Sequence, residues 1–113
     1  MKPPSHLDDR GHALQRFIER WWPFTEAEVR LRAPHKKAAA LQLRRDELDR
    51  AVCTGAYPVE IIPDERQSIW AFVVAGGPNR GRTALMVVSE NGTVRTVLPP
   101  EAERTNRRPR KLK

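Results

Sequence analysis

The spacing of hydrophobic residues changes near Gly55, which predicts a helical first half and a β second half. In the first helix, apolar positions recur at three- and four-residue intervals, at Ala13, Leu14, Phe17, Ile18 and Trp21. This is the period of an amphipathic helix that buries one stripe. Asp8 or Asp9 is expected to cap its start, and Pro23 to end it.

Two further helical segments are predicted before Gly55. Thr25 and Glu28 have the spacing of a capping box, which predicts a short helix as far as about Leu31. Residues 35–43 contain an alanine run that favours helix, although the positions just before it alternate as in a strand. Residues 44–52 carry a clearer apolar stripe, and Gly55 is placed as a helix terminator.

After Gly55 the apolar period is two, which predicts strands at 57–62, 68–75, 83–89 and 93–98. The second and third strands are apolar on both faces, so we expect them at the centre of the sheet. Glu90-Asn91-Gly92 predicts a tight type I′ hairpin turn, because Asn-Gly suits positive φ angles. The expected fold is α+β, with the N-terminal helices packed on a four-stranded antiparallel meander.

The length of 113 residues is enough for one domain with a modest core. We expect a flexible arm at residues 1–7, a single α+β domain at 8–98 and a basic, disordered tail at 99–113. Cys53 is the single cysteine, which excludes an internal disulfide and a CxxC metal site. The histidines are not spaced as a metal set, so we expect neither metal nor cofactor. No apolar run is long enough for a membrane span, and we expect a cytoplasmic protein.

Charge adds a candidate partner to this picture. Lys and Arg total 21 against 14 acidic residues, a net charge of +7, and arginine matches phosphate well. Six of these cations lie in the tail and are candidate phosphate contacts: Arg104, Arg107, Arg108, Arg110, Lys111 and Lys113. The surplus fits nucleic-acid binding, but it equally fits simple solubility or an acidic protein partner.

The candidate chemistry is metal-independent RNA cleavage. The substrate 2′-hydroxyl is the nucleophile, so the protein must hold the phosphate, offset its charge and move protons. His12 can move a proton, and Arg16, four residues later, shares its helix face. Arg80 and Arg82 lie in a glycine-rich loop suited to phosphate, and Arg95 lies in the last strand. Solvated surface residues and a flexible hairpin loop remain the plain alternatives for these positions.

Three segments resemble a known family. They are His12-Ala13-Leu14-Gln15-Arg16, then Asp46-Glu47-Leu48-Asp49-Arg50-Ala51-Val52 leading to Gly55, then Val94-Arg95-Thr96-Val97-Leu98. Together they resemble small RelE-like domains of the barnase–EndoU–colicin–RelE group of metal-independent ribonucleases and toxins. A first-helix His followed four residues later by Arg is common there, and His12 and Arg16 match these positions. Residues 22–43 look like an insertion, and the last strands show no additional catalytic His or Tyr.

The leading expectation is therefore a small RelE-like ribonuclease toxin, or a toxin-like protein, that acts on RNA. His12, Arg16, Arg82 and Arg95 are its candidate catalytic residues, and Arg80, Arg82 and the tail cations are its candidate nucleic-acid contacts. An acidic antitoxin or immunity-type protein is the expected protein partner. The alternatives are a non-catalytic nucleic-acid-binding module and a regulatory accessory protein that docks through its basic tail.

Overall fold

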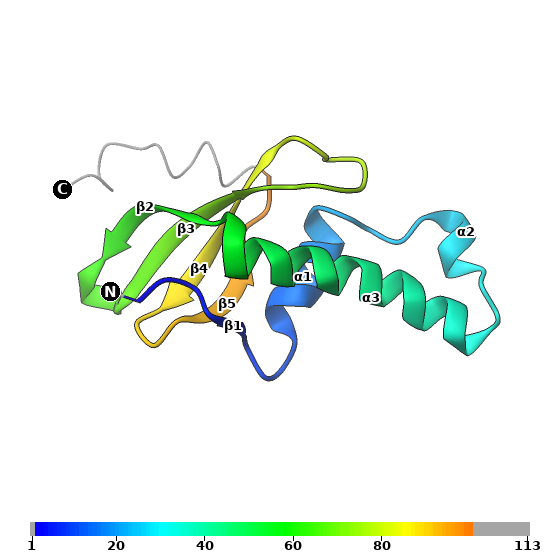
Figure 1. Ribbon diagram of the computed structural model, residues 1–113, viewed down its shortest axis with the longest axis horizontal. Coiled ribbons are helices and arrows are strands. Elements are labelled where there is room, and N and C mark those ends of the chain that lie inside the picture. Colours follow the sequence, from blue (N-terminus) through cyan, green and yellow to red (C-terminus); the bar gives the residue numbers. More distant parts are fainter. Residues whose placement is uncertain (1, 101–113) are drawn as a thin grey trace.

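The computed structural model describes residues 2–100 and has an α+β architecture, with helices packed against one face of a twisted sheet (Figure 1). The strands are β1 (His6–Leu7), β2 (Tyr57–Ile62), β3 (Gln67–Val73), β4 (Thr83–Ser89) and β5 (Thr93–Val97). The helices are α1 (His12–Arg20), α2 (Glu26–Val29) and α3 (Pro34–Arg50), which continues into a π-helical turn, Ala51–Gly55. Residues 101–113, which include the six candidate cations of the predicted tail, lie outside the described part.

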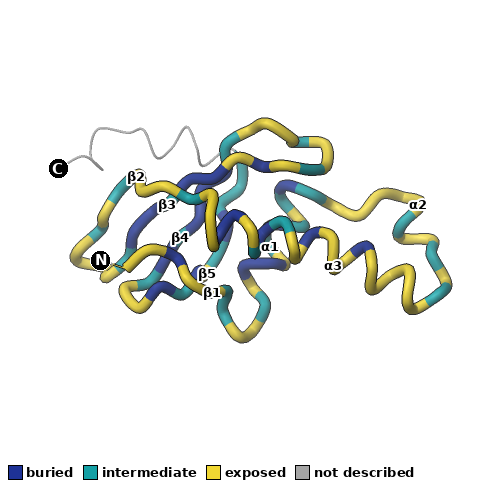
Figure 2. The backbone as a smooth tube through the Cα atoms, in the orientation of Figure 1, coloured by how far each residue is buried: buried dark blue, intermediate teal, exposed yellow. Residues whose placement is uncertain are grey.

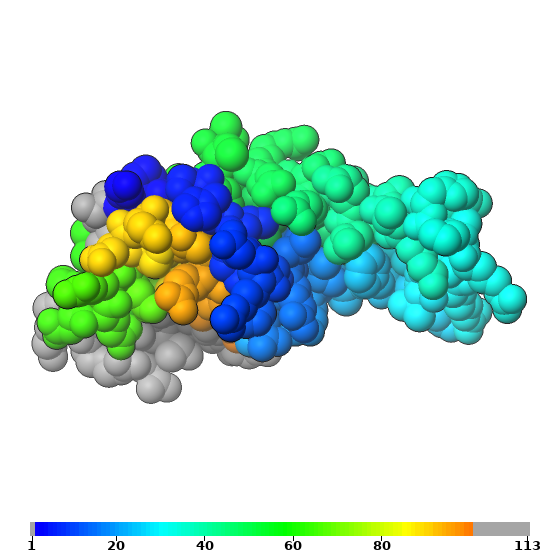
Figure 3. Space-filling model, turned by 90° about the horizontal axis from the view of Figure 1, so that it is seen from below, coloured from blue at the N-terminus to red at the C-terminus, as the bar shows by residue number. Residues whose placement is uncertain are grey.

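The sheet has five strands in the order β1-β5-β4-β3-β2, and it is mixed. The prediction of a purely antiparallel four-stranded meander is therefore wrong in one respect. Residues expected to form a loose arm instead add β1, whose His6 and Leu7 pair in parallel with Thr93 and Val94 of β5. Two residues are too few for a period-two pattern, so hydrophobic spacing does not reveal this strand. Figure 3 shows the N-terminal segment, in dark blue, lying against the β4–β5 hairpin.

The main core lies between the sheet and the helices, as the alternation along β3 and β4 predicts. Phe72, Val74, Met86 and Val88 face Phe17 and its helical neighbours, and each of them is almost fully buried. The opposite face carries a smaller cluster around Ile69, Ala71 and Leu85. Figure 2 shows the buried positions concentrated in the central strands and in the helical segments next to them. The assignment of both apolar faces of these strands is confirmed.

Helix α1 is held by polar contacts at both of its ends. At its start, Asp8 accepts hydrogen bonds from the backbone N–H groups of Ala13 at 2.9 Å and His12 at 3.2 Å. This carboxylate supplies the cap predicted from the sequence, although Gly11 occupies the N-cap position itself. At the other end, the Trp21 indole N–H donates to the carbonyl of Leu98 at 2.7 Å. Rotation of the helix about its axis would therefore break the Asp8 cap and the bond to Leu98, which directly follows β5.

Helix α2 and the first half of α3 form an arm that extends beyond the sheet (Figure 1). The predicted capping box is confirmed: the Thr25 hydroxyl accepts from Glu28 N–H, and the Glu28 carboxylate accepts from Thr25 N–H. The helical prediction for residues 35–43 is also confirmed, because α3 begins at Pro34 and runs without a break. Pro at the first turn suits a helix start, since the missing N–H has no partner there in any case.

Arg44 joins the arm to the rest of the domain, and its side chain is completely buried. Its guanidinium donates to the backbone carbonyls of Trp22, Pro23 and Ala40 and to both carboxylate oxygens of Glu28. These bonds use all five N–H donors of an arginine. The Arg44 hydrogen bonds, together with the Thr25 backbone N–H, hold the pKa of Glu28 below its usual value. A buried charge is tolerated here because every donor has a partner.

The β3–β4 connection, residues 74–82, packs against α1 and the segment that follows it. The Asn79 amide donates to the carbonyl of Trp21 at 2.9 Å, and the Trp22 ring lies directly against Gly76 and Gly77. A Cβ atom built on either glycine would lie 2.5 Å from a carbon of that ring. The loop that the sequence offers as a phosphate cradle is thus a packing surface for tryptophan.

The β4–β5 turn differs from the predicted type I′ geometry. Gly92 N–H donates to the carbonyl of Ser89 at 3.0 Å, so Glu90 and Asn91 are the central residues, and neither has a positive φ. Gly92 follows with φ of 90°, the combination of a type I turn and a glycine bulge. A Cβ on Gly92 would lie 2.7 Å from Ser5 Oγ. The glycine thereby leaves room for the N-terminal segment that leads into β1.

Candidate functional site

The order of the strands decides which loops share an end of the sheet. In consecutive antiparallel strands the connections alternate between the two ends, so the β2–β3 and β4–β5 turns lie together and the β3–β4 loop lies opposite. Strand β1 runs parallel to β5, and its two residues pair with Thr93 and Val94, next to the β4–β5 turn. Because β1 is so short, the segment between β1 and α1 begins close to this turn, where Asp8 N–H donates to the carbonyl of Val94 at 3.1 Å. The two hairpin turns and this segment therefore border one region of the sheet.

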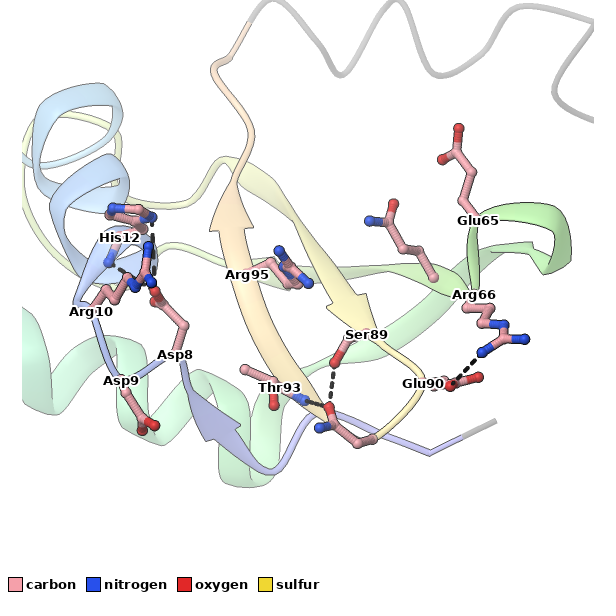
Figure 4. A pocket seen from close by; sticks show the side chains of 12 residues that line it. Asp8, Asp9, Arg10, His12, Glu65, Arg66, Ser89, Glu90, Thr93 and Arg95 are labelled. Atoms are coloured by element: carbon pink, nitrogen blue, oxygen red, sulfur yellow. Dashed lines mark hydrogen bonds and ion pairs between the residues drawn. The ribbon is translucent and has the colours of Figure 1, made fainter.

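A groove of about 720 Å³ lies where these connections meet, and we call it the hairpin-end groove. Its lining comes from the segment before α1, the β2–β3 turn and the β4–β5 hairpin, as Figure 4 shows. The lining is mainly polar and charged: Asp8, Asp9, Arg10, His12, Glu65, Arg66, Gln67, Ser89, Glu90, Asn91, Thr93 and Arg95. Such a concentration of side chains that can bind and transfer protons makes this groove the candidate functional site.

His12 is placed by the start of α1. Its side chain is 58% exposed, and Nδ1 lies 4.0 Å from Asp8 Oδ2, the oxygen that also accepts the His12 backbone N–H. Since Asp8 lies on the Nδ1 side, Nε2 is the ring nitrogen available to a ligand.

Arg95 projects from β5 into the middle of the groove, between the α1 side and the β2–β3 turn (Figure 4). The register between β4 and β5 shifts here: Val87 pairs with Thr96 and Val88 with Val94. Arg95 is the extra residue of this bulge and is exposed. Bulges re-aim a side chain from a strand, which explains how an arginine at this position reaches the open groove.

The β4–β5 hairpin holds its polar side chains through a local network. The Ser89 hydroxyl donates to Asn91 Oδ1, which also accepts from Thr93 N–H at 3.1 Å. The Thr93 hydroxyl hydrogen-bonds His6 Nε2 at 2.8 Å, and His6 Nδ1 contacts the hydroxyl of Ser5 at 2.9 Å. These contacts orient one wall of the groove before any ligand binds.

The charges in the groove are mixed rather than uniformly positive. Three arginines and His12 face four carboxylates, and Arg66 lies 3.7 Å from Glu90. Within residues 2–100, neither Arg10 nor Arg95 forms an ion pair. In the described part of the chain, the groove therefore offers two guanidinium groups that belong to no ion pair, next to groups that can accept a proton.

Of the four candidate catalytic residues, the structure brings together only His12 and Arg95. Arg16 does not line the groove, and its guanidinium donates to Glu19 at 2.9 Å on the exposed side of α1. Hydrogen bonds from Gln15 and Arg16 hold the pKa of Glu19 below its usual value. Although His12 and Arg16 were expected on one helix face, Arg16 forms a surface ion pair and does not join His12 in one site.

Arg80 and Arg82 lie at the opposite end of the sheet. Strand β4 separates them from the groove, and its seven residues span about 20 Å. Arg82 donates to Asn79 Oδ1 at 2.8 Å, and its guanidinium carbon lies 5.5 Å from the centre of the Trp21 ring. Arg80 is exposed on the loop. These two residues cannot contact the phosphate that Arg95 would hold.

Sequence reasoning missed Arg10, Arg66 and His6. Arg10 and Arg66 carry no periodic signal because both lie in turns, and Arg66 has a φ of 54°. The predicted order of antiparallel strands did contain a signal for Arg66. In such an order the β2–β3 turn, which carries Arg66, lies at the same end of the sheet as the β4–β5 turn. Among the described residues, no group of three or more His, Cys, Asp or Glu side chains is arranged to hold a metal ion.

Comparison with known proteins adds no identification to this geometry. Within residues 2–100, no helix is both long and apolar enough to cross a membrane. The chain matches no protein-family model, no curated protein and no solved structure.

Proposed function

We propose that this protein binds RNA in the hairpin-end groove and cleaves it without a metal ion, as a small RelE-like ribonuclease or toxin-like protein. The observation that carries the proposal is that His12, from the helical half, and Arg95, from the last strand, line the same groove. A proton-transfer group and a phosphate ligand are the minimum that cleavage by the substrate 2′-hydroxyl requires. An acidic antitoxin-like protein is the partner expected of such a toxic enzyme.

In the proposed reaction, the 2′-hydroxyl oxygen attacks the adjacent phosphorus and the bond to the 5′ oxygen breaks. His12 Nε2 accepts the 2′-hydroxyl proton, and water or a protonated groove side chain supplies the proton that the leaving 5′ oxygen takes. Asp8 Oδ2, 4.0 Å from Nδ1, lies on the side of the ring away from this transfer. Arg95 donates to the non-bridging oxygens and offsets the charge that develops on them.

Non-catalytic binding of nucleic acid is the second candidate function. It is favoured by the positions of Arg16 and Arg82, because only two of the four candidate catalytic residues line the groove. The groove carboxylates also repel a polyanion, so general attraction must come from the net charge of +7. This function predicts salt-sensitive binding of RNA with no turnover.

Replacing His12 by alanine is expected to lower the rate of RNA cleavage at least about a hundredfold, the usual contribution of a positioned general base. The measurement is the cleavage of total RNA and tRNA in excess EDTA, followed on denaturing gels. His35→Ala is the matched control, because His35 is exposed at the start of α3 and does not line the groove. If the parent protein leaves the RNA intact but shifts it on a gel in a salt-dependent way, the cleavage proposal is wrong and the second candidate function is supported.

Replacing Arg95 by alanine is expected to weaken RNA binding about tenfold, because a charge-assisted hydrogen bond to phosphate is lost. The affinity is measured by fluorescence anisotropy with single-stranded RNA at several salt concentrations, where one lost phosphate contact reduces the salt slope. Arg80→Ala is the comparison, since Arg80 is exposed at the other end of the sheet. An equal loss for both variants would show that RNA does not bind in the groove.

A further inference from the structure

A second groove lies on the helical side of the molecule and is unlike the first in its chemistry. Two adjoining hollows of about 450 and 370 Å³ share Phe24 and Leu41, and we call them together the helix groove. Leu14 and Ile18 of α1 line one hollow, while Val29 of α2 and Ala40 of α3 line the other. The proposed reaction uses none of these apolar residues.

Large apolar side chains remain exposed in this groove. Phe24 is 38% exposed, Leu41 42% and Val29 68%, in a domain whose central residues are almost fully buried. Adjacent exposed apolar side chains with polar neighbours are typical of a surface that binds another protein. Figure 1 shows that α3 passes beside α1 and reaches α2 at the far end of the arm.

The groove is held open by the interior of the arm. One face of the Phe24 ring lies 4.3 Å from the Arg44 guanidinium carbon, and Arg44 is fixed by five hydrogen bonds. Phe24 therefore cannot turn inward to fill the hollows. A preformed groove lowers the cost of ordering the binding surface.

The charges at the groove select the kind of partner. Both of its carboxylates are already neutralised, Glu19 by Arg16 and Glu28 by Arg44. Lys37 lines the second hollow, and within residues 2–100 it forms no ion pair. The charge left for a partner is therefore positive, which favours an acidic molecule. A second copy is disfavoured, because each chain carries a net charge of +7.

The shape of the groove selects an α-helix. Its walls come from helices and two connecting segments, so it offers no strand edge to which an extended peptide could add. Side chains four residues apart on a helix lie on one face, one turn from each other, and can enter adjoining hollows. We propose that the helix groove binds an amphipathic helix of a partner protein, whose apolar residues enter the two hollows and whose acidic residues face Lys37.

The test uses a fluorescent amphipathic peptide of about 18 residues, long enough to form helix, with leucines on one face and glutamates on its flanks. Its controls are a scrambled peptide of the same composition and a version with lysine in place of glutamate. We expect the acidic amphipathic peptide to bind at least about tenfold more tightly than either control. Equal affinities for the three peptides, or preference for the basic one, would overturn the proposal.

The variants locate the binding site. Leu41→Asp is expected to lower the affinity for the acidic peptide at least about tenfold, because a charge enters the apolar hollow. Leu43→Asp is the matched control, since Leu43 is 53% exposed on the same helix and lines neither hollow. Lys37→Glu should weaken binding of the acidic peptide, whereas Lys36→Glu should change it less. An equal loss for the two leucine variants would contradict this location.

Two further measurements keep the outcome clear. Thermal unfolding checks that each variant folds, and Val29→Asp replaces Leu41→Asp if the latter does not. Sedimentation of the parent tests the second copy: a dimer that Leu41→Asp dissolves would overturn the acidic partner and make the groove a self-interface. Leu41→Asp should leave RNA cleavage unchanged, so the proposed ribonuclease activity and this docking site can fail independently.

Discussion

Replacing Arg44 by methionine is expected to lower the free energy of unfolding by about 3 to 5 kcal/mol, the cost of removing one partner from a buried ion pair. Methionine can fill the space between the Trp22 and Phe24 rings, which lie 4.9 and 4.3 Å from the Arg44 guanidinium carbon. It cannot donate to the three backbone carbonyls and the carboxylate that Arg44 satisfies. Urea denaturation, followed by tryptophan fluorescence, measures the loss.

Arg45→Met is the matched control. Arg45 lies next to Arg44 on α3, but its side chain is 55% exposed and lies 3.9 Å from Asp49. We expect a change within about 0.5 kcal/mol, because exposed ion pairs contribute little. Equal unfolding midpoints for the two variants would show that the arm does not depend on the buried guanidinium.

The same substitution should change how stability depends on pH. Arg44 lowers the pKa of Glu28 in the folded state, so the unfolded state binds the proton more readily. This contribution is present above the unfolded pKa and is lost as pH falls through the lowered folded pKa, in a window below about pH 4.3. The stability difference between the parent and Arg44→Met should therefore shrink in that window. A constant difference down to about pH 2 would indicate that Glu28 is not part of the effect.

Replacing Gly77 by alanine is expected to destabilise the protein by about 3 kcal/mol, through backbone strain and a steric clash together. Gly77 has a φ of 79°, and its Cβ would lie 2.5 Å from Trp22 Cδ1. The tryptophan ring has little freedom to move aside, since the fixed guanidinium of Arg44 lies 4.9 Å from its centre. Thermal and urea unfolding of the purified variant measure the effect.

Two glycines of the same loop separate the two causes. Gly81 has a φ of 89° with nothing within 4 Å of its Cβ position, so Gly81→Ala tests strain alone and should cost about 1 kcal/mol. Gly76 lacks the positive φ but faces the same ring at 2.5 Å, so Gly76→Ala tests the clash. If Gly77→Ala proved no worse than Gly81→Ala, the ring would have to yield freely, contrary to the fixed packing described above.

The candidate site was predictable only in part. His12 was recognised as a titratable residue at a helix start, and Arg95 as a cation in the last strand, and both line the groove. Arg82 does not join His12 and Arg95, because connections between consecutive antiparallel strands alternate between the two ends of the sheet. The β3–β4 loop, which carries Arg82, therefore lies at the other end. The grouping of His12 with Arg16 rested on helical spacing, which shows that two side chains share a face but not which way that face points.

The helix groove shows a different reason for incomplete prediction. Phe24, Val29 and Leu41 lie on three segments, and none of them belongs to an apolar stripe that the sequence makes conspicuous. Their proximity depends on how α3 folds back along α1, and Arg44 holds that arrangement through carbonyls of residues 22 and 23. Contacts between segments of this kind leave no periodic trace along the chain.

Local patterns in the sequence by themselves determined the helical and β halves, the capping box at Thr25 and the two faces of β3 and β4. They could do so because helices and strands bury side chains at fixed periods, and caps follow from local hydrogen bonding. The tertiary structure alone decided the parallel strand β1, the burial of Arg44 and the placement of His12 and Arg95 in one groove. Each of these depends on contacts between segments that are distant in the sequence, which leave no periodic pattern along the chain. For Arg44, the free energy of satisfying a buried polar group outweighs local preference.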